Sequence, residues 1–109
     1  MCKRMQAINQ LTMYAVIFRA EINKLDSRYA EIASRMRDLA ITKYGCSEFT
    51  SVTEGSQEIA ISYWQDQEQI KKWKEDSEHL AAQKLGKSNW YKFYKVQIVE
   101  IIREYSKNT

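Results

Sequence analysis

The chain is predicted to fold as one α+β domain of the ferredoxin-like kind, with an antiparallel sheet and the order strand, helix, strand, strand, helix, strand. Apolar residues alternate with a period of two in several stretches, and between these they recur at the three-and-four spacing of helices. The length of 109 residues suits a single hydrophobic core, and 44% hydrophobic with 28% charged residues is typical of a globular protein.

The first strand is predicted at residues 13–22, because apolar side chains occupy one face while Arg19 and Glu21 occupy the other. The apolar face holds Tyr14, Val16, Phe18, Ala20 and Ile22. A helix with one buried stripe is predicted next, ending near Tyr44. Gly45 follows it and can take the left-handed conformation that closes helices.

The second half of the chain is predicted as a hairpin, a helical region and a long strand. Residues 46–55 and 57–64 form the hairpin, since β-branched and aromatic residues dominate its second strand. Asp66 begins a capping-box pattern that starts a helical region reaching about residue 85. The last strand is predicted at residues 91–105, apolar on both sides over much of its length.

The pattern also predicts a homodimer. A lone sheet with helices on one face would leave apolar groups of its third and fourth strands in water. Contiguous exposed apolar patches usually mark an interface. Two copies that cover each other's open faces are the simplest solution.

A soluble cytoplasmic protein is expected. No apolar run approaches the ~20 residues needed to span a bilayer, and residues 1–12 lack the apolar stretch of a secretory signal. Cys2 and Cys46 are isolated cysteines, which suits free thiols in a reducing compartment.

Several function classes are disfavoured. The net charge of +3 is small and acids alternate with lysines, so no nucleic-acid partner is expected. The densest basic group is interpreted as a solvated face, with phosphate contact as the alternative: Lys84, Lys87, Lys92 and Lys95. RNA-recognition domains share the topology, but residues 58–64 lack their glycine and basic residue. Three glycines cannot build a phosphate-binding loop, and one histidine with two distant cysteines does not predict a metal site. The absence of a GxSxG motif disfavours a serine triad.

Four segments resemble the antibiotic biosynthesis monooxygenase superfamily: YAVIFRAEI, the Gly45–Cys46 entry to the second strand, EIAISYWQDQEQIKKWKEDSEHLAAQ, and NWYKFYKVQIVEIIREY. The resemblance covers about residues 13–105. Its most specific part is Trp64 at the end of the third strand, Trp73 on the next helix, His79 six residues later, and Trp90–Tyr91 before the last strand.

The resemblance implies a dimeric α+β barrel with one pocket per subunit between sheet and helices. The domain would span residues 13–106, with residues 1–12 a poorly ordered extension. The implied activity is that of a monooxygenase acting with O2 on a small aromatic or polycyclic phenolic substrate. It would need no metal, flavin or haem, because the deprotonated substrate itself reduces dioxygen.

Such chemistry requires a dry aromatic cavity, a proton acceptor and hydrogen-bond donors for the anion. His79 and Trp64 are the candidate catalytic residues: His79 is the only histidine, and Trp64 stands where the pocket should open. One unbroken helix over residues 66–85 would direct His79 into solvent. If Asp76–Ser77 instead caps a second helix, His79 can face inward.

Seven further residues are candidates for substrate binding: Phe18, Arg19, Phe49, Tyr63, Trp73, Trp90 and Tyr94. The aromatic ones have an equally natural interpretation as packing groups, since large aromatics supply much of the buried area of a small domain. Arg19 could hold an anion, lie on a solvated face, or pair with Glu21.

Two alternatives share this fold. The dimer could bind a small apolar metabolite without turning it over, and nothing in the sequence excludes this. Haem degradation is disfavoured: Gln83 stands where the resemblance would require the haem-ligating histidine, and Phe18 or a neighbour replaces the expected asparagine.

Overall fold

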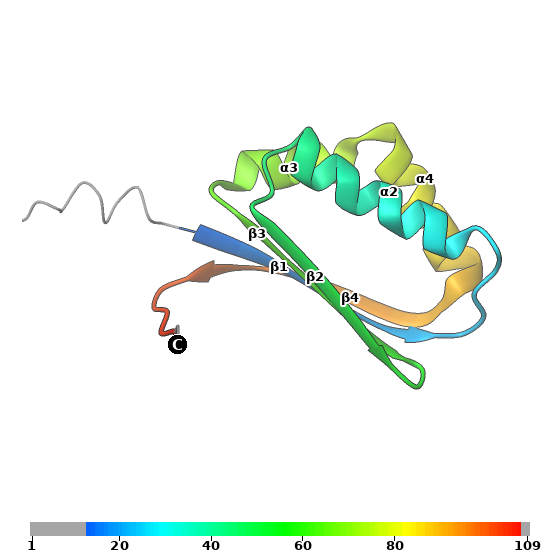
Figure 1. The fold of residues 1–109 in the computed structure, drawn as a ribbon. Coiled ribbons are helices and arrows are strands. Elements are labelled where there is room, and N and C mark those ends of the chain that lie inside the picture. The colour runs from blue at the N-terminus through cyan, green and yellow to red at the C-terminus, as the bar shows by residue number, and fades with distance from the viewer. Residues whose placement is uncertain (1–12, 108–109) are drawn as a thin grey trace, which may run out of the picture.

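The computed structural model describes residues 13–107, which form a four-stranded antiparallel sheet with all helices on one side (Figure 1). The elements run β1 (Met13–Ile22), α2 (Tyr29–Thr42), β2 (Glu48–Glu54), β3 (Gln57–Trp64), α3 (Gln67–Glu75), α4 (Ser77–Leu85), the short π-helix η1 (Gly86–Trp90) and β4 (Tyr91–Ile101). This order confirms the predicted ferredoxin-like fold. The predicted extension at residues 1–12, with Cys2, lies outside the described residues.

The sheet has the strand order β2-β3-β1-β4, so β1 and β3 are central. Phe18 of β1 pairs with Ala60 of β3 and Val96 of β4, which places all three side chains on the face beneath the helices. The last strand ends at Ile101 and not at residue 105 as predicted, because β1, its pairing strand, begins opposite at Met13.

The hydrophobic core lies between the sheet and the three helices, at the end where β3 leads into α3. Its centre is Trp64, which is 0% exposed and packs against Trp73 with the ring centroids 5.2 Å apart. Trp73 in turn donates its indole N–H to the Met36 carbonyl oxygen at 3.1 Å and so ties α3 to α2. Burial of aromatic rings of this size contributes much of the stability of a small domain.

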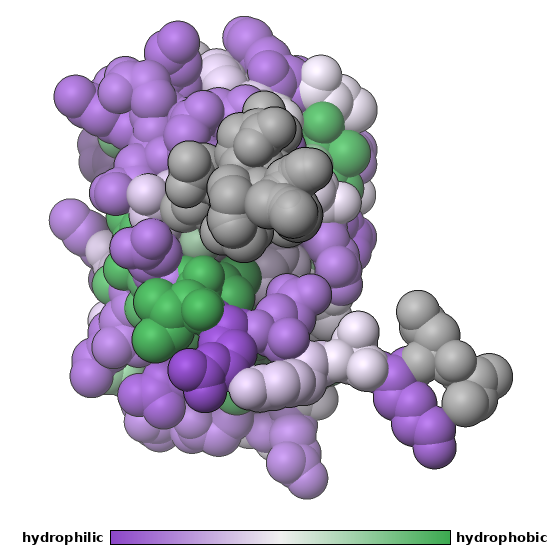
Figure 2. Space-filling view, turned by 90° about the vertical axis from the view of Figure 1, so that its left-hand side faces the viewer, coloured by the Kyte–Doolittle hydropathy of each residue, from purple (hydrophilic) through white to green (hydrophobic). Residues whose placement is uncertain are grey.

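The opposite face of the sheet carries no helix (Figure 1). The strand register places a set of mainly apolar side chains on it: Ala15, Ile17, Ile59, Ile61, Tyr63 and Val99. We call these six residues the open face. Figure 2 looks onto the end of the sheet where β1 begins, and there hydrophobic side chains gather below the helices within a largely hydrophilic surface.

The structure also describes the Cys46 thiol and the lengths of the helices. Cys46 is a buried free thiol whose Sγ contacts the Glu48 carbonyl oxygen at 3.1 Å. Over residues 13–107, none of the helices is long and apolar enough to cross a bilayer.

Candidate active site

A cavity of about 330 Å³ lies between the sheet and the helices. Six of the residues predicted as site residues line it: Phe18, Phe49, Trp73, His79, Trp90 and Tyr94. They come from three strands, two α-helices and the π-helix, so the cavity forms only in the folded domain. Its volume lies at the lower end of the range of small-molecule pockets.

Three predicted site residues lie elsewhere. Trp64 is wholly buried behind Trp73 and donates its indole N–H to Ser62 Oγ at 2.8 Å, so its placement does not agree with the predicted contact with a ligand. Arg19 and Tyr63 occupy register positions on the uncovered side of the sheet, away from the cavity. The alternation of β1 already placed Arg19 opposite Phe18.

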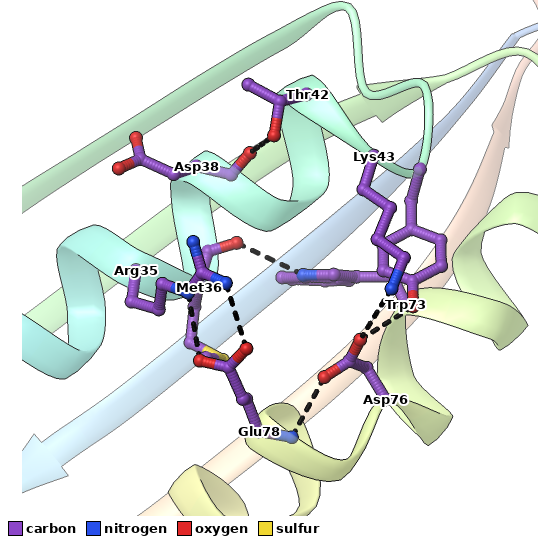
Figure 3. A network of polar contacts seen from close by, with 9 residues as sticks. Arg35, Met36, Asp38, Thr42, Lys43, Trp73, Asp76 and Glu78 are labelled. Carbon is purple, nitrogen blue, oxygen red and sulfur yellow. Dashed lines mark hydrogen bonds and ion pairs between the residues drawn. The ribbon is translucent and has the colours of Figure 1, made fainter.

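His79 lines the cavity because the helical region is broken between α3 and α4. Figure 3 shows Asp76 at this break. Asp76 makes the break: its Oδ1 accepts the Glu78 backbone N–H at 2.8 Å and caps α4. Its Oδ2 accepts the Tyr44 hydroxyl at 2.6 Å, with Lys43 Nζ at 3.9 Å. The Tyr44 hydrogen bond is the main reason why the pKa of Asp76 is lowered. Of the two predicted alternatives, the structure therefore has the split helix.

His79 is held as a neutral ring with a defined tautomer. The Gln83 amide nitrogen lies 2.8 Å from His79 Nδ1 and also donates to the Lys74 carbonyl oxygen at 3.2 Å. Because that nitrogen is a donor, Nδ1 is the acceptor and Nε2 carries the ring proton. Burial, together with the charge of Lys74, lowers the pKa of His79 to about 4. At neutral pH the residue is therefore a hydrogen-bond donor through Nε2.

The ring of His79 is packed edge-on against Trp73, with the centroids 4.3 Å apart. Lys74 lies in the same part of the cavity wall, and burial lowers the pKa of its ammonium group. This end of the cavity thus presents one N–H donor and one partly buried cation.

A second polar group in the wall consists of Glu58, Tyr29 and Tyr91, which we call the Glu58 cluster. Glu58 is only 8% exposed, and its Oε1 accepts the Tyr29 hydroxyl. The Tyr91 hydroxyl lies 3.4 Å from both that oxygen and the Tyr29 hydroxyl. Burial raises the pKa of Tyr29, and raises the pKa of Tyr91 to about 12, so both hydroxyls stay protonated at neutral pH.

The Glu58 cluster was not predicted. A sequence signal for Glu58 exists, because it lies six residues before Trp64 and therefore on the same face of β3. Tyr29 and Tyr91 come from α2 and β4, and no local pattern brings them together. Their rings are surrounded by other aromatics: Tyr29 lies 5.1 Å from Trp90, and Tyr91 lies 5.4 Å from Phe18.

Among residues 13–107, no three His, Cys, Asp or Glu side chains gather as a metal-binding group. Gln83, which stands where the resemblance would require a haem-ligating histidine, contacts His79 Nδ1 and the Lys74 carbonyl oxygen through its amide nitrogen.

The chain is 37% identical to the uncharacterized protein YqjZ of Bacillus subtilis over 92 residues, which are 84% of this chain and 81% of YqjZ. No family model matches. Among solved structures, a mutant of SnoaB, a cofactor-independent oxygenase from Streptomyces nogalater, is similar with a TM-score of 0.73 at 10% identity, covering 87% of this chain and 98% of its own.

Two other structures are similar over comparable lengths. Rv0793 of Mycobacterium tuberculosis has a TM-score of 0.73 at 13% identity and covers 86% of this chain and 99% of its own. A putative antibiotic biosynthesis monooxygenase from Nitrosomonas europaea has a TM-score of 0.67 at 17% identity and covers 83% and 90%. At these identities the likeness shows a shared fold.

Proposed function

Because the chain belongs to the same family as YqjZ and has the fold of the antibiotic biosynthesis monooxygenase superfamily, we propose that it is an oxygenase of that type. Its substrate would be a small hydroxylated aromatic molecule, oxidised by O2 without a resident cofactor. The observation that carries this proposal is the cavity of about 330 Å³, lined by aromatic rings and by the N–H donor of His79.

The aromatic lining supports the choice of ligand. Phe18, Tyr91 and Tyr94 lie within 6.2 Å of one another by ring centroid, and Trp73 forms another wall. A planar ring system can stack or pack edge-on against such side chains. The few polar groups then fix its orientation, as is usual for small-molecule pockets.

The proposed reaction balances without an external reductant. Loss of a proton makes the substrate an electron-rich anion, which gives one electron to O2. The resulting radicals join through a new C–O bond to form a peroxide. When its O–O bond breaks and water leaves, a methylene carbon has become a carbonyl. One oxygen atom of O2 stays in the product and the other becomes water. The Nε2–H of His79 would stabilise negative charge on a substrate oxygen.

We also propose that two copies associate through the open face. Ile17 and Ile61 are direct cross-strand neighbours at its centre, and Tyr63 and Val99 extend it on either side. A partner sheet would remove these side chains from water, at roughly 25 cal/mol for each Å² of apolar surface. Association through the open face would leave the cavity unobstructed, because the cavity lies on the other side of the sheet, beneath the helices.

The proposal is tested by oxygen-electrode measurements with 2-hydroxyanthrone in metal-free buffer, corrected for the rate without protein. We expect protein-dependent oxygen uptake. His79→Ala should lower kcat by about 100-fold, the effect of removing one donor to a developing oxyanion. Leu80→Ala is the control, since Leu80 is 52% exposed and lies outside the cavity.

Two results would contradict the oxygenase proposal. One is oxygen uptake that responds equally to both substitutions. The other is saturable quenching of tryptophan fluorescence by aromatic compounds without any oxygen uptake, which would instead support a ligand-binding dimer.

A further inference from the structure

The carboxylate of Glu58 has room for another hydrogen-bond donor. A carboxylate can accept about four hydrogen bonds, and Glu58 receives one close contact, from Tyr29. The Tyr91 hydroxyl at 3.4 Å is beyond the usual O–H···O range of about 2.5–3.0 Å. Among the described residues no lysine, arginine or histidine forms an ion pair with Glu58. A buried carboxylate in this state attracts a donor from a ligand.

The Glu58 cluster and His79 lie toward opposite ends of the cavity. Glu58 and Trp64 are six residues apart on β3, which separates their Cα atoms by roughly 20 Å. His79 packs on Trp73, and Trp73 packs on Trp64. The cavity is therefore polarised: an anionic acceptor is at one end, and a donor with the Lys74 cation is at the other.

We infer that Glu58 accepts the proton of the substrate, and that the cavity selects a flat aromatic molecule with a hydroxyl group conjugated to a carbonyl group at its other end. This inference rests on the proposed function. The hydroxyl group binds Glu58 at the position that Tyr91 fills only loosely. The carbonyl oxygen binds His79 Nε2–H at the end where Lys74 lies.

The proton transfer follows from this placement. The substrate O–H bond breaks, the proton moves to a Glu58 carboxylate oxygen, and the electron pair spreads through the conjugated rings to the carbonyl oxygen. The complex carries the same total charge before and after. Negative charge thus moves from the Glu58 end to the end where a donor and a cation can stabilise it.

The other titratable groups of the cavity are less suited to accept this proton. Nδ1 of His79 is occupied by Gln83, and Nε2 already carries the ring proton. Tyr29 and Tyr91 are protonated phenols whose pKa is raised by burial. Tyr29 is a positioning residue, because its hydroxyl fixes the Glu58 carboxylate from α2.

The test uses two probes that differ only in the hydroxyl group: 2-hydroxyanthraquinone and its methyl ether. Binding is measured by quenching of tryptophan fluorescence, since Trp73 and Trp90 line the cavity. The wild-type protein should bind the hydroxyl compound at least ten-fold more tightly, as expected for a hydrogen bond to a charged acceptor. Glu58→Gln should reduce this preference several-fold.

Glu54→Gln is the matched control, because Glu54 is exposed at the end of β2 and outside the cavity. It should keep the wild-type preference. Tyr91→Phe removes the hydroxyl group that lies 3.4 Å from Glu58, so this variant should keep or increase the preference for the hydroxyl compound. The comparison of the two probes on the wild-type protein does not depend on any variant folding. Equal affinity for both probes, or a preference that Glu58→Gln retains, would overturn the assignment of Glu58.

The same variants separate this inference from the proposed function. With a compound that the wild-type protein oxidises, Glu58→Gln should lower kcat by at least 100-fold, the usual effect of removing a general base. Oxygen uptake by Glu58→Gln at the wild-type rate would overturn the inference and leave the oxygenase proposal intact. A Glu58-dependent hydroxyl preference in a protein that consumes no oxygen would support the binding assignment and overturn the oxygenase proposal.

Discussion

His79 should remain uncharged over the pH range in which an exposed histidine titrates, and this property should make the protein sensitive to acid. Burial, with the nearby Lys74 charge, lowers its pKa from 6.5 to about 4. Between these values the unfolded chain binds a proton that the folded protein does not. The free energy of unfolding therefore falls as the pH is lowered through this window, whereas above pH 6.5 His79 imposes no such penalty.

The magnitude follows from the two pKa values. Each pH unit between 6.5 and about 4 corresponds to about 1.4 kcal/mol, which gives a loss of about 3 kcal/mol on going from pH 7 to pH 4. Carboxylates also titrate in this range, so the quantity to compare is the difference between wild type and His79→Gln. That difference should change by about 3 kcal/mol between the two pH values, to the disadvantage of the wild type.

Two measurements test this. Urea unfolding followed by tryptophan fluorescence gives the free energies at each pH. Because His79 is the only histidine in the chain, proton NMR of a tag-free protein follows the titration of one imidazole. Lys74→Met should raise its midpoint, since the lysine charge opposes protonation. A wild-type titration midpoint near 6.5 would refute the buried neutral histidine. So would a His79→Gln variant that loses as much free energy of unfolding between pH 7 and pH 4 as the wild type.

Three other predictions concern the fold. Gly45→Ala and Gly55→Ala should each lower the free energy of unfolding by about 1–2 kcal/mol, because both glycines have a left-handed backbone. At Gly45 the new Cβ would lie 2.5 Å from Gln69 Nε2, but that flexible side chain can turn away; losses well below about 1 kcal/mol in urea unfolding would argue against the left-handed conformations. Asp76→Ala should lower Tm by roughly 4–8 °C through loss of the α4 cap, and an unchanged thermal melt would contradict that role. Ile61→Lys on the open face should convert a dimer into a monomer in sedimentation velocity; an unchanged sedimentation coefficient would argue against this interface.

The sequence predicted the central strands well and the edge of the sheet less well. Residues 13–22 and 57–64 agree with β1 and β3, because their alternation is a local property that a single covered face enforces. The end of β4 was predicted four residues too late. Residues 102–105 continue the apolar pattern, but where β4 stops depends on where β1 begins, and that is a nonlocal fact.

In the candidate site, too, local sequence patterns predicted which side chains face the helices but not which distant side chains meet. Aromatic residues beneath the helices, such as Phe18 and Trp73, were predicted because large rings on the covered face must line either core or cavity. The strand period could not tell that Trp73 would cover Trp64 and exclude it from the cavity. The Glu58 cluster could not be predicted either, since its contacts join β3 to α2 and β4, which are far apart in the sequence.

The position of Asp76 links the stability of the fold to the chemistry of the cavity. A continuous helix from α3 through α4 would be the simpler structure, but it would carry His79 around to the solvent side. Asp76 interrupts that helix with an extended backbone, caps the next one, and is anchored by the Tyr44 hydroxyl to the turn that follows α2. Because the cap fixes where α4 begins, it also fixes which side chains of its first turn face inward. The donor end of the cavity therefore depends on a carboxylate that lies outside the cavity lining.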